Sequence, residues 1–453
     1  MSRAAAAALL AVVALAGCRD STTDPVDAGP PPVTLDQARA ERLACTFKAG
    51  AMPAETLATD AVRGDQMPID HILLVMQENR SFDHLFSGLA DAGARAAAPD
   101  ASNPDGQGNP VVRFHQTDYC FADTEHSWSA EHLEWDEGKN DGFVVANGAG
   151  GARAMGYYDA TDLPYYDALA RSFATSDMHF CSLLGPTWPN RMYYFAATSW
   201  GRIRNRLPPV NDPHGHRYRD LFQALTKAGV SWKVYSQGVP SPIILLQSYV
   251  DYEDHFVSFD DYLADVAANT LPQVAWVEAD FVHDVGQDDD HPPNDIQKGQ
   301  AYLEEVLKPL MASPAWARSV LFLTYDENGG LYDSVPPPTA CPPDDLPPDL
   351  EQGDPDAGFD RYGFRVPLIA ISPYAKPGYI SHEVSDHTSI VRFVEARFDL
   401  PALTARDANA DALLDLFDFA HPQPAPQLPE VVVDPTQLEQ CLARFPPQDG
   451  GFL

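Results

Sequence analysis

Short apolar runs that stop abruptly at polar residues recur along this chain. Five of them have the length of a strand: 72–76, 230–235, 274–277, 320–324 and 366–372. A continuous apolar run of this length is typical of a strand covered on both faces, as in a parallel sheet. The first run is the most informative, because Glu78 and Asn79 follow it at once. Burying such polar groups directly beyond a core strand costs free energy unless they bind something.

Helical patterns lie between these strands. The segment 218–228 ends at Gly229, which suits the position after a helix, and the segment 388–398 follows Asp386, a suitable N-cap. The segment 296–311 carries apolar residues at helical spacing. Strands that alternate with helices predict an α/β layered fold with a mostly parallel sheet. In such a sheet the functional residues gather at the carboxyl ends of the strands.

Composition bounds the size and the partners of the protein. Its 453 residues suffice for one large α/β domain or two ordinary ones, and a hydrophobic content of 45% supports a real core. With 30 basic against 65 acidic residues, the formal net charge is −35. A surface this negative disfavours binding to nucleic acid and docking on anionic lipid, whereas it suits the capture of divalent cations.

The N-terminus has the pattern of an export signal. Arg3 precedes an apolar run at 4–15, too short to span a bilayer, and Cys18 follows a leucine and two small residues. We therefore predict a lipoprotein signal peptide at 1–18 and lipid anchoring through Cys18 to a bacterial membrane, in the periplasm or at the cell surface. The alternative is an ordinary signal peptide with an unrelated cysteine.

The rest of the chain divides by composition. Residues 19–66 form a polar, proline-rich tether and lead-in, 67–420 a catalytic domain, and 421–453 a proline-rich C-terminal tail. The segment 341–360 is long, acidic and rich in proline, and we expect it to be an exposed excursion. No internal repeat and no second core is evident, so the prediction is one catalytic domain.

Cysteine usage agrees with export. Five cysteines remain besides Cys18, and none forms a C-x-x-C pair: Cys45, Cys120, Cys181, Cys341 and Cys441. A zinc ribbon or a thioredoxin-like motif is therefore disfavoured. We expect one or two disulfides with one thiol left over, and the sequence leaves the pairing open.

Oxygen ligands follow two of the predicted strands. Glu78 and Asn79 follow the run 72–76, and Asp326 and Glu327 follow the run 320–324. A set of oxygen donors without thiolates suits calcium, magnesium or manganese better than a structural zinc. We therefore expect a divalent cation at these residues, with the identity of the cation open.

Thr187 is the candidate nucleophile and a further metal ligand. It follows Gly185 and Pro186 and precedes Pro189, which suits the first turn of a helix. Free N–H groups at a helix start favour a phosphate oxygen, and a cation beside the hydroxyl would lower its pKa. The plainer interpretation makes Thr187 a helix-capping residue.

Two histidines have a sequence context that favours chemistry. His126 lies in an HxW segment, and His291 lies in an HPP segment. A histidine can bind a phosphate oxygen or move a proton near neutral pH. Five other histidines are expected to be surface or packing residues: His71, His115, His179, His214 and His421. His255 is a weaker candidate for a phosphate contact, against which we decide.

Several of these segments, in this order, resemble the bacterial phosphoesterase family, which includes phosphatidylcholine-type phospholipases C and acid phosphatases. The matching segments are ENRSFDH at 78–84, HxW…H…GKxDGF from His126, GPTWPNR at 185–191, HPP at 291–293 and DENGG at 326–330. The resemblance runs from about residue 68 to residue 419. It implies an alkaline phosphatase-like fold, with a mostly parallel central sheet and helices on both faces.

The resemblance also implies roles for particular residues. Glu78, Asn79, Asp326, Glu327 and Thr187 would hold the metal, and Thr187 would attack phosphorus. The two catalytic histidines, His126 and His291, would hold the transferring phosphoryl group, and three residues would bind the substrate: Asn190, His132 and Lys139. Asp83, His84, His387 and Thr388 would brace the site.

The chain departs from the family pattern at one titratable position. Ser334 stands where the family usually has a histidine, so a proton-relay role there is in doubt. The chain also lacks the length of the larger phospholipases, which weakens a specific phospholipid assignment. Five aromatic residues could form a cage for a choline head group or could simply be core: Trp128, Trp135, Tyr157, Tyr158 and Trp188.

The functional prediction is an exported, metal-dependent phosphoric ester hydrolase that forms a phosphothreonine intermediate. Its substrate would be a phospholipid head group or a small phosphomonoester, and the sequence does not decide between them. The alternative from another class is a non-enzymatic lipoprotein that binds a solute or a divalent cation. No C-x-P-x-R segment is present, which disfavours a sulfatase.

Overall fold

The computed structural model describes residues 33–207, 219–280 and 287–446. The predicted signal peptide, Cys18, residues 19–32 of the tether and His214 lie outside these residues. Among the described residues, no helix combines the length and the apolar character needed to cross a membrane.

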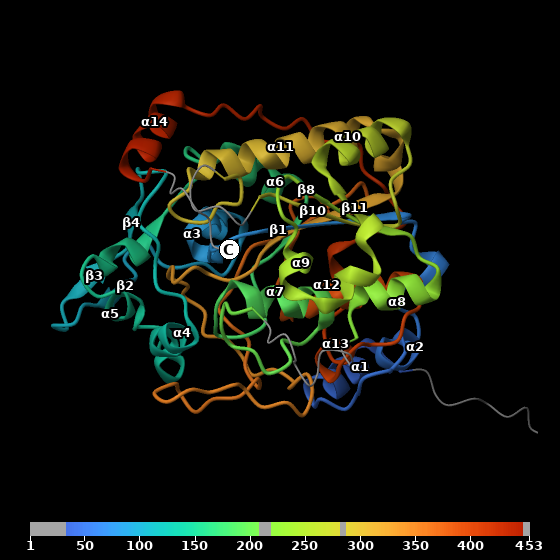
Figure 1. Cartoon of the computed structure of the whole chain (residues 1–453), viewed down its shortest axis with the longest axis horizontal. Helices are drawn as coiled ribbons and strands as arrows, with labels where there is room; N and C mark the ends of the chain where they lie inside the picture. The colour runs from blue at the N-terminus through green and yellow to red at the C-terminus, as the bar shows by residue number, and fades with distance from the viewer. Residues whose placement is uncertain (1–32, 208–218, 281–286, 447–453) are drawn as a thin grey trace, which may run out of the picture.

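An eight-stranded sheet forms the centre of the molecule (Figure 1). Its order is β13 (Ile380–Ser381), β6 (Ala174–Ser176), β12 (Leu368–Ile371), β11 (Ser319–Tyr325), β1 (His71–Gln77), β10 (Val274–Glu278), β8 (Trp232–Ser236) and β9 (Phe256–Ser258). β12 pairs antiparallel with both of its neighbours, and the other pairings are parallel. All five predicted strands are present, and the expected mostly parallel sheet is confirmed.

The central strand β1 sets the position of the polar loops. It pairs in parallel with β11, and Gln77 lies opposite Tyr325 at the end of the ladder. Residues 72–77 and 319–325 are buried, as expected for strands covered on both faces. Because the two strands end in register, the loops that begin at Glu78 and Asp326 leave the sheet side by side.

Helices cover both faces of this sheet (Figure 1). One layer contains α6 (Pro164–Ser172), α10 (Phe259–Ala268) and α11 (Ile296–Ala312), and the other contains α7 (Thr187–Ala196), α8 (Leu221–Ala228) and α12 (His387–Phe398). Gly229 ends α8 with φ of 73°, and Asp386 occupies the N-cap of α12, as predicted. The expected fold class, α/β with helices on both faces, is confirmed.

The remaining elements are short and lie around this core. The helices are α1 (Leu35–Leu43), α2 (Pro53–Thr56), α3 (Phe82–Phe86), α4 (Trp128–Trp135), α5 (Phe143–Ala146), α9 (Ser241–Leu245), α13 (Ala405–Ala408) and α14 (Pro435–Arg444). The strands are β2 (Ser102–Pro104), β3 (Pro110–Val112), β4 (Phe114–His115), β5 (Gly156–Tyr157), β7 (His179–Phe180) and β14 (Ser385–Asp386).

Two disulfides tie the ends of the described chain to its body. Cys45 bonds to Cys341, and Cys120 bonds to Cys441 in α14. Cys181 remains a buried free thiol. The expectation of one or two disulfides with one thiol left over is therefore confirmed.

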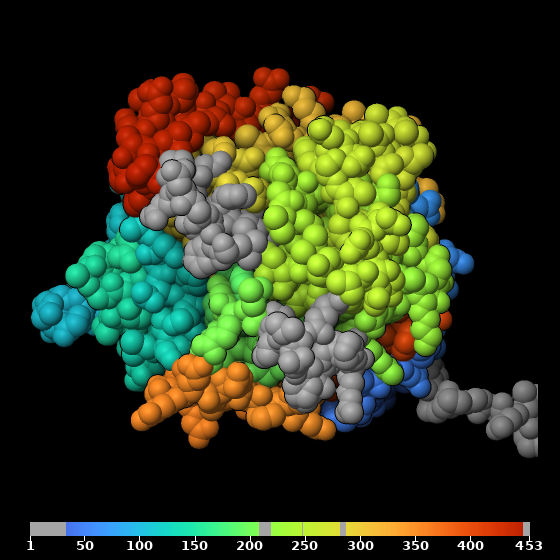
Figure 2. All heavy atoms as spheres, viewed as in Figure 1, coloured from blue at the N-terminus to red at the C-terminus, as the bar shows by residue number. Residues whose placement is uncertain are grey.

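The acidic segment 341–360 is an excursion at one end of the molecule, drawn in orange in Figure 2. Most of its residues are exposed or half-buried, as expected. It is nevertheless attached, because Arg206 pairs with Glu351 at 2.8 Å and Phe359 packs against Trp128 with ring centroids 6.0 Å apart. The segment therefore covers part of α4.

Candidate active site

The loops after β1 and β11 are joined by hydrogen bonds. The Asn79 N–H donates to Asp326 Oδ1 at 3.0 Å, and the Arg80 N–H donates to the Glu327 carbonyl at 3.1 Å. Asn79 has φ of 60°, a left-handed conformation that turns the chain sharply at this point. The structure thus brings Asn79 together with Asp326 and Glu327, which lie far along the chain from it.

Among the described residues, three buried oxygens at this junction have no hydrogen-bond partner: Asn79 Oδ1, Asp326 Oδ2 and Glu327 Oε1. All three side chains are fully buried. Leaving such groups unsatisfied costs about 1–3 kcal/mol each, and more when they are charged. Amide and carboxylate oxygens are the donors that hard divalent cations prefer. The donor set at this place therefore fits a bound cation.

Arg191 connects the nucleophile helix to these loops. Its buried guanidinium pairs with Glu78 at 2.8 Å, with Asp326 at 3.5 Å and with Glu278 at 3.9 Å. Thr187 lies four residues earlier in α7, on the same helix face. The ion pairs of Arg191 thus direct the first turn of α7 toward the ends of β1 and β11. Sequence analysis gave Arg191 no role, because an arginine inside a helix is usually a solvated residue.

Glu78 is held by this arginine. Its side chain is buried, and burial raises the pKa of its carboxyl well above the usual value, while Arg191 acts in the opposite direction. Its backbone N–H donates to the Asp289 carbonyl at 2.8 Å, which ties the β1 loop to the segment that carries His291. Glu78 therefore lies at the centre of the site with one oxygen already engaged by Arg191.

Thr187 is the first residue of α7, and Pro186 occupies the N-cap. Thr187 is thus not the capping residue of the plainer interpretation. Its side chain is 4% exposed. The Trp188 N–H donates to Asn205 Oδ1 at 2.8 Å, and Pro189 has no N–H. The positive end of the helix dipole at this position still favours an anion.

Two buried side chains shape the loop before Thr187. Asn190 Oδ1 accepts the N–H groups of Ser182 and Leu183 at 2.9 and 3.1 Å, and Asn190 Nδ2 donates to the Gly185 carbonyl at 2.7 Å. Glu131 in α4 accepts the Gly185 N–H at 2.9 Å. Asn190, expected to bind substrate, is fully buried and uses its amide within the loop, so its position is that of a support.

His126 faces the Asn79–Glu327 junction. Its Nε2 lies 3.3 Å from Asn79 Nδ2 and 3.8 Å from Glu327 Oε1, and its Nδ1 lies 2.6 Å from the Thr124 carbonyl. Burial by itself would lower the pKa of His126, but the carboxylates of Glu327 and Asp123 outweigh it and raise the pKa to about 9. The site thus favours a positive charge at this ring.

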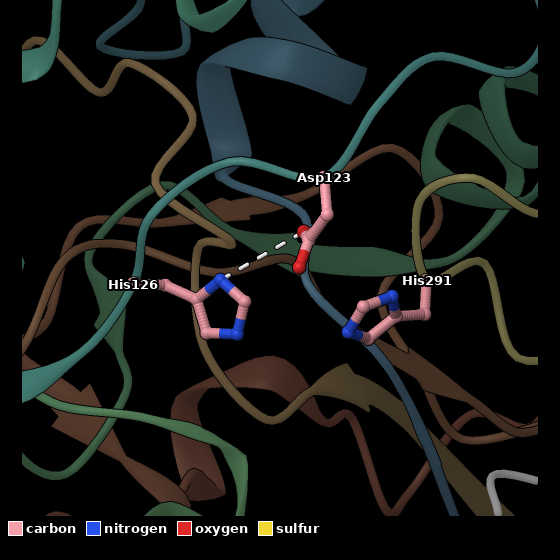
Figure 3. A group of neighbouring side chains, drawn as sticks. All are labelled: Asp123, His126 and His291. Atoms are coloured by element: carbon pink, nitrogen blue, oxygen red, sulfur yellow. Dashed lines mark ion pairs between the residues drawn. The ribbon is translucent and has the colours of Figure 1, made fainter. Parts of the chain in front are cut away.

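His291 approaches the same place from the segment before α11. Its ring lies nearly at right angles to that of His126, with centroids 5.9 Å apart. Asp123, which sequence analysis did not identify, lies beside both rings, and one ligand atom from each of the three residues falls within 4.8 Å of the others. Figure 3 shows the Asp123 carboxylate between the two imidazoles. The spacing of Asp123 three residues before His126 was the available signal.

The other two predicted substrate-binding residues lie in different surroundings. The His132 ring stacks on Trp128 with centroids 4.3 Å apart, and its Nδ1 lies 2.6 Å from the Trp128 carbonyl. Lys139 is exposed and pairs with Asp136 at 2.5 Å on the surface. These contacts give His132 a packing role on α4 and Lys139 a surface position.

The aromatic residues considered for a choline cage are spread through the packing. Trp128 is buried against Phe359, and Tyr158 is buried against His84. Arg361 lies over the Trp135 ring at 4.3 Å, and Arg113 lies over the Tyr157 ring at 4.2 Å. Trp188 packs on the edge of the main core. The structure therefore favours the core interpretation for these rings.

Ser334, at the position of the family histidine, belongs to a buried network under α3. Its hydroxyl donates to Asp83 Oδ2 at 2.6 Å, and Arg365 donates to the same oxygen at 2.9 Å. Asp333 completes the network by accepting from Arg365 at 2.7 Å. Asp83 thus orients the first loop, as expected, and Ser334 contributes to the packing of that loop.

Three other histidines lie in supporting positions: His84, His255 and His387. His387 Nε2 lies 2.7 Å from the Asp326 carbonyl and braces that loop, and the His84 ring lies 3.2 Å from Arg80 Nη1. His255 stacks on Trp232 with centroids 4.0 Å apart, near the β8–β9 edge of the sheet. These positions agree with the bracing role expected of His84 and His387 and with the decision against His255.

Comparison with known proteins identifies the family. The sequence profile of the Phosphoesterase family matches residues 69–401. Phospholipase C B of Mycobacterium tuberculosis is 33% identical over 431 residues, which cover 81% of this chain and 81% of that protein. Non-specific phospholipase C4 of Arabidopsis thaliana is 30% identical over 418 residues, which cover 83% of this chain and 76% of that protein.

The chain belongs to the phosphoesterase family. It is accordingly a hydrolase that acts on phosphoric esters, and the family resemblance seen in the sequence is confirmed. Among solved structures, a Vibrio parahaemolyticus protein in the alkaline phosphatase superfamily matches 72% of this chain and 76% of its own, with 11% identity and a TM-score of 0.33.

Proposed function

We propose that this phosphoesterase hydrolyses its substrate by means of a divalent cation and the hydroxyl of Thr187. The observation that carries the proposal is the set of buried oxygens without a hydrogen bond on Asn79, Asp326 and Glu327, connected through the Arg191–Asp326 ion pair to the helix that begins at Thr187. Family membership decides against the non-enzymatic alternative.

The cation would be held by Glu78, Asn79, Asp326, Glu327 and Thr187. When bound, it would lower the pKa of the Thr187 hydroxyl and offset charge on phosphoryl oxygens. Calcium, magnesium and manganese remain the favoured identities, because the donors are oxygens.

The reaction we propose has two steps. The Thr187 hydroxyl gives up its proton, Oγ forms a bond to phosphorus, and the bond from phosphorus to the leaving oxygen breaks; that oxygen takes up a proton and departs as the alcohol, which leaves a phosphothreonine. Water then cleaves the phosphothreonine and returns a proton to Oγ. The Thr187 N–H at the start of α7, together with His126 and His291, would stabilise charge on the phosphoryl oxygens, where catalysis of this transfer chiefly arises.

Replacement of the nucleophile tests this proposal. We expect Thr187→Ala to lower turnover at least about 1,000-fold while the fold is kept, because no other group can form the covalent intermediate. Thr187→Ser should retain partial activity. The control is Thr161→Ala, which removes an exposed hydroxyl from a surface turn.

The decisive readout is a phosphorylated peptide. Protein quenched during turnover should carry one phosphoryl group on the peptide that contains Thr187, as measured by mass spectrometry. Full activity in Thr187→Ala, or phosphate bound at another residue, would contradict the assignment. Loss of activity in chelator, with recovery on adding back Ca²⁺, Mg²⁺ or Mn²⁺, tests the cation separately.

The names of the relatives support a proposal for the substrate class. Relatives in two distant organisms are named phospholipase C, which favours a phospholipid diester over a phosphomonoester. The dispersal of the aromatic residues argues against a preformed choline cage made of those rings. Parallel assays with a choline phospholipid, an ethanolamine phospholipid and a phosphomonoester would rank the alternatives.

We also propose export, with lipid attachment at Cys18. Two disulfides are typical of an oxidising compartment outside the cytosol. Metabolic labelling with a fatty acid, compared between the natural chain and Cys18→Ala, measures the attachment. Equal labelling of both chains would exclude Cys18 as the lipid carrier.

A further inference from the structure

Asp290 is a buried carboxylate that directly precedes His291 and has no part in the hydrolytic steps above. It is 1% exposed, and its Oδ2 accepts the hydroxyls of Tyr166 and Tyr325, each at 2.7 Å. Tyr166 belongs to α6, and Tyr325 is the last residue of β11. The carboxylate thus joins the segment that carries His291 to a covering helix and to the end of a central strand.

A second helix packs against the same side chain. Gly299 lies in α11, and a Cβ added there would meet Asp290 Oδ1 at 1.9 Å. Among the described residues, Asp290 Oδ1 has no hydrogen-bond partner. The glycine therefore leaves the room that the carboxylate fills, and close packing fixes the carboxylate on this side.

The main chain before His291 is tied to the end of β1 and to the loop that follows it. The carbonyls of residues 288–290 accept hydrogen bonds in turn from three side-chain or main-chain donors: Gln77 Nε2 at 3.0 Å, the Glu78 N–H at 2.8 Å and Arg80 Nε at 2.9 Å. Glu78 is one of the proposed cation ligands. The segment that carries His291 is therefore held beside the ligand loop along three successive residues.

The backbone of Asp290 turns sharply at this point. Its φ of 72° lies in the left-handed region, which is uncommon for residues other than glycine. Such a conformation persists where the surrounding contacts hold it in place. The two tyrosine hydroxyls hold the side chain, and Arg80 holds the carbonyl. The turn that leads into His291 is thus fixed through Asp290.

We propose that Asp290 is a positioning residue for phosphoryl transfer. Its carboxyl couples His291 to the ends of β1 and β11, so that the imidazole keeps its place relative to the cation ligands Glu78 and Asp326. The inference rests on the proposed function, because it gives Asp290 its effect through His291 and not through contact with the substrate. A displacement of about 1 Å in a catalytic group costs about 100-fold in rate, so a fixed imidazole matters.

The surroundings of Asp290 identify its conservative replacement. Burial raises the pKa of this carboxyl to about 7, while Arg80 and the two tyrosine hydroxyls act in the opposite direction. A neutral side chain of the same shape should therefore be tolerated, and asparagine also adopts the left-handed conformation. In Asp290→Asn the amide oxygen can still accept both hydroxyls, whereas Asp290→Ala removes the acceptor.

A double-mutant cycle on the full-length protein tests whether Asp290 acts through His291. We expect Asp290→Ala to lower kcat and kcat/KM together by about 100-fold, and Asp290→Asn to recover most of that loss. In the His291→Gln background, Asp290→Ala should cost less than about 3-fold more, because the group that it positions is already gone. Asp220→Ala is the matched control: it removes another buried carboxylate, the N-cap of α8, and should leave both kinetic constants unchanged.

A second variant keeps the test valid if Asp290→Ala does not fold. The pair Tyr166→Phe with Tyr325→Phe removes both donors and leaves the left-handed backbone residue unchanged. It should lower kcat in the natural background and have little further effect in His291→Gln. Loss of activity by the same factor in both backgrounds, for this pair or for Asp290→Ala, would overturn the inference.

Nuclear magnetic resonance of labelled histidine gives a readout apart from activity. The imidazole resonance of His291, assigned by its absence from His291→Gln, should move in Asp290→Ala and keep its position in Asp220→Ala. An unmoved resonance in Asp290→Ala would also overturn the inference. Both adverse results would leave the phosphothreonine step standing, whereas an active Thr187→Ala would remove that step and leave the measured coupling of Asp290 to His291 intact.

Discussion

At the scale of single residues, Arg191 pairs with three buried carboxylates. It lies among Glu78, Asp326 and Glu278 at the ends of three neighbouring strands. These carboxylates hold the pKa of its guanidinium above the ordinary value despite burial, which acts the other way. Without this charge, like charges would repel one another inside the core. Arg191 therefore stabilises the acidic site in the absence of a cation and positions α7.

We predict that Arg191→Met destabilises the protein by about 3–5 kcal/mol, the usual cost of removing one partner of a buried ion pair. Urea unfolding in chelator measures the loss, and added Mg²⁺ or Ca²⁺ should recover part of it by replacing the missing charge. Arg191→Lys keeps the charge but loses the planar fork that spans several carboxylates, so it should be intermediate.

A surface arginine supplies the control for this prediction. Arg206 pairs with Glu351 at 2.8 Å with both side chains exposed, and solvent screening leaves such pairs little effect on stability. Arg206→Met should therefore leave the unfolding curve almost unchanged. Equal losses for the two methionine variants would show that Arg191 contributes no more than a surface ion pair.

At the scale of elements, the turn after β11 joins the two ligand loops through contacts between backbones. Gly329 has φ of +64°, and a Cβ there would lie 2.6 Å from the Asn79 carbonyl oxygen. The Gly329 N–H also donates to Glu327 Oε2. The glycine thus permits both the left-handed backbone and the close approach that places Asn79 beside Glu327.

We predict that Gly329→Ala lowers activity by about 100-fold, because a displacement of about 1 Å in catalytic groups costs that much. The strain of a left-handed alanine should add roughly 1–2 kcal/mol of destabilisation. Gly353→Ala isolates the strain, since Gly353 has φ of +105° but a Cβ there would meet no atom within 4 Å. Steady-state kinetics of both variants, with their unfolding curves, separate the two effects.

Two outcomes of the comparison between these glycine variants would contradict the prediction. If Gly353→Ala and Gly329→Ala lose the same activity, the approach of Gly329 to Asn79 does not matter for catalysis. If neither loses activity, the junction of the β1 and β11 loops tolerates movement that a catalytic site would not.

The same elements show how far sequence analysis reaches. The strands at 72–76 and 320–324 were predictable, because an uninterrupted apolar run of this length that ends in polar residues is typical of a buried strand. The direction of the strand at 366–372 was not, since an apolar run is compatible with parallel and antiparallel pairing alike. Arg191 was missed because its contacts join segments more than 100 residues apart, as in the Arg191–Glu78 pair. The sequence motifs identified residues that lie near the site. Only the tertiary contacts showed which of these residues, such as Asn190, are buried and support the loops.

At the scale of the whole molecule, the two disulfides close loops over most of the chain. The bonded cysteines are 296 and 321 residues apart in sequence. In the chain-entropy account, such links stabilise the protein by restricting the unfolded state. The two disulfides hold different parts of the chain. Cys441 is the one buried residue of the exposed helix α14, so the Cys120–Cys441 link holds that helix.

We predict that the double substitution Cys120→Ser with Cys441→Ser costs about 2–5 kcal/mol and releases α14. The helix should become cleavable by protease under native conditions, since apart from Cys441 it buries little surface, while the sheet and the active-site loops stay protected. Limited proteolysis followed by peptide mapping measures this, and activity should persist because α14 contributes no residue to the proposed site. The variant Cys45→Ser with Cys341→Ser should leave α14 protected. Protection of α14 in both variants would mean that non-covalent contacts, rather than the Cys120–Cys441 link, hold the C-terminal helix on the catalytic body.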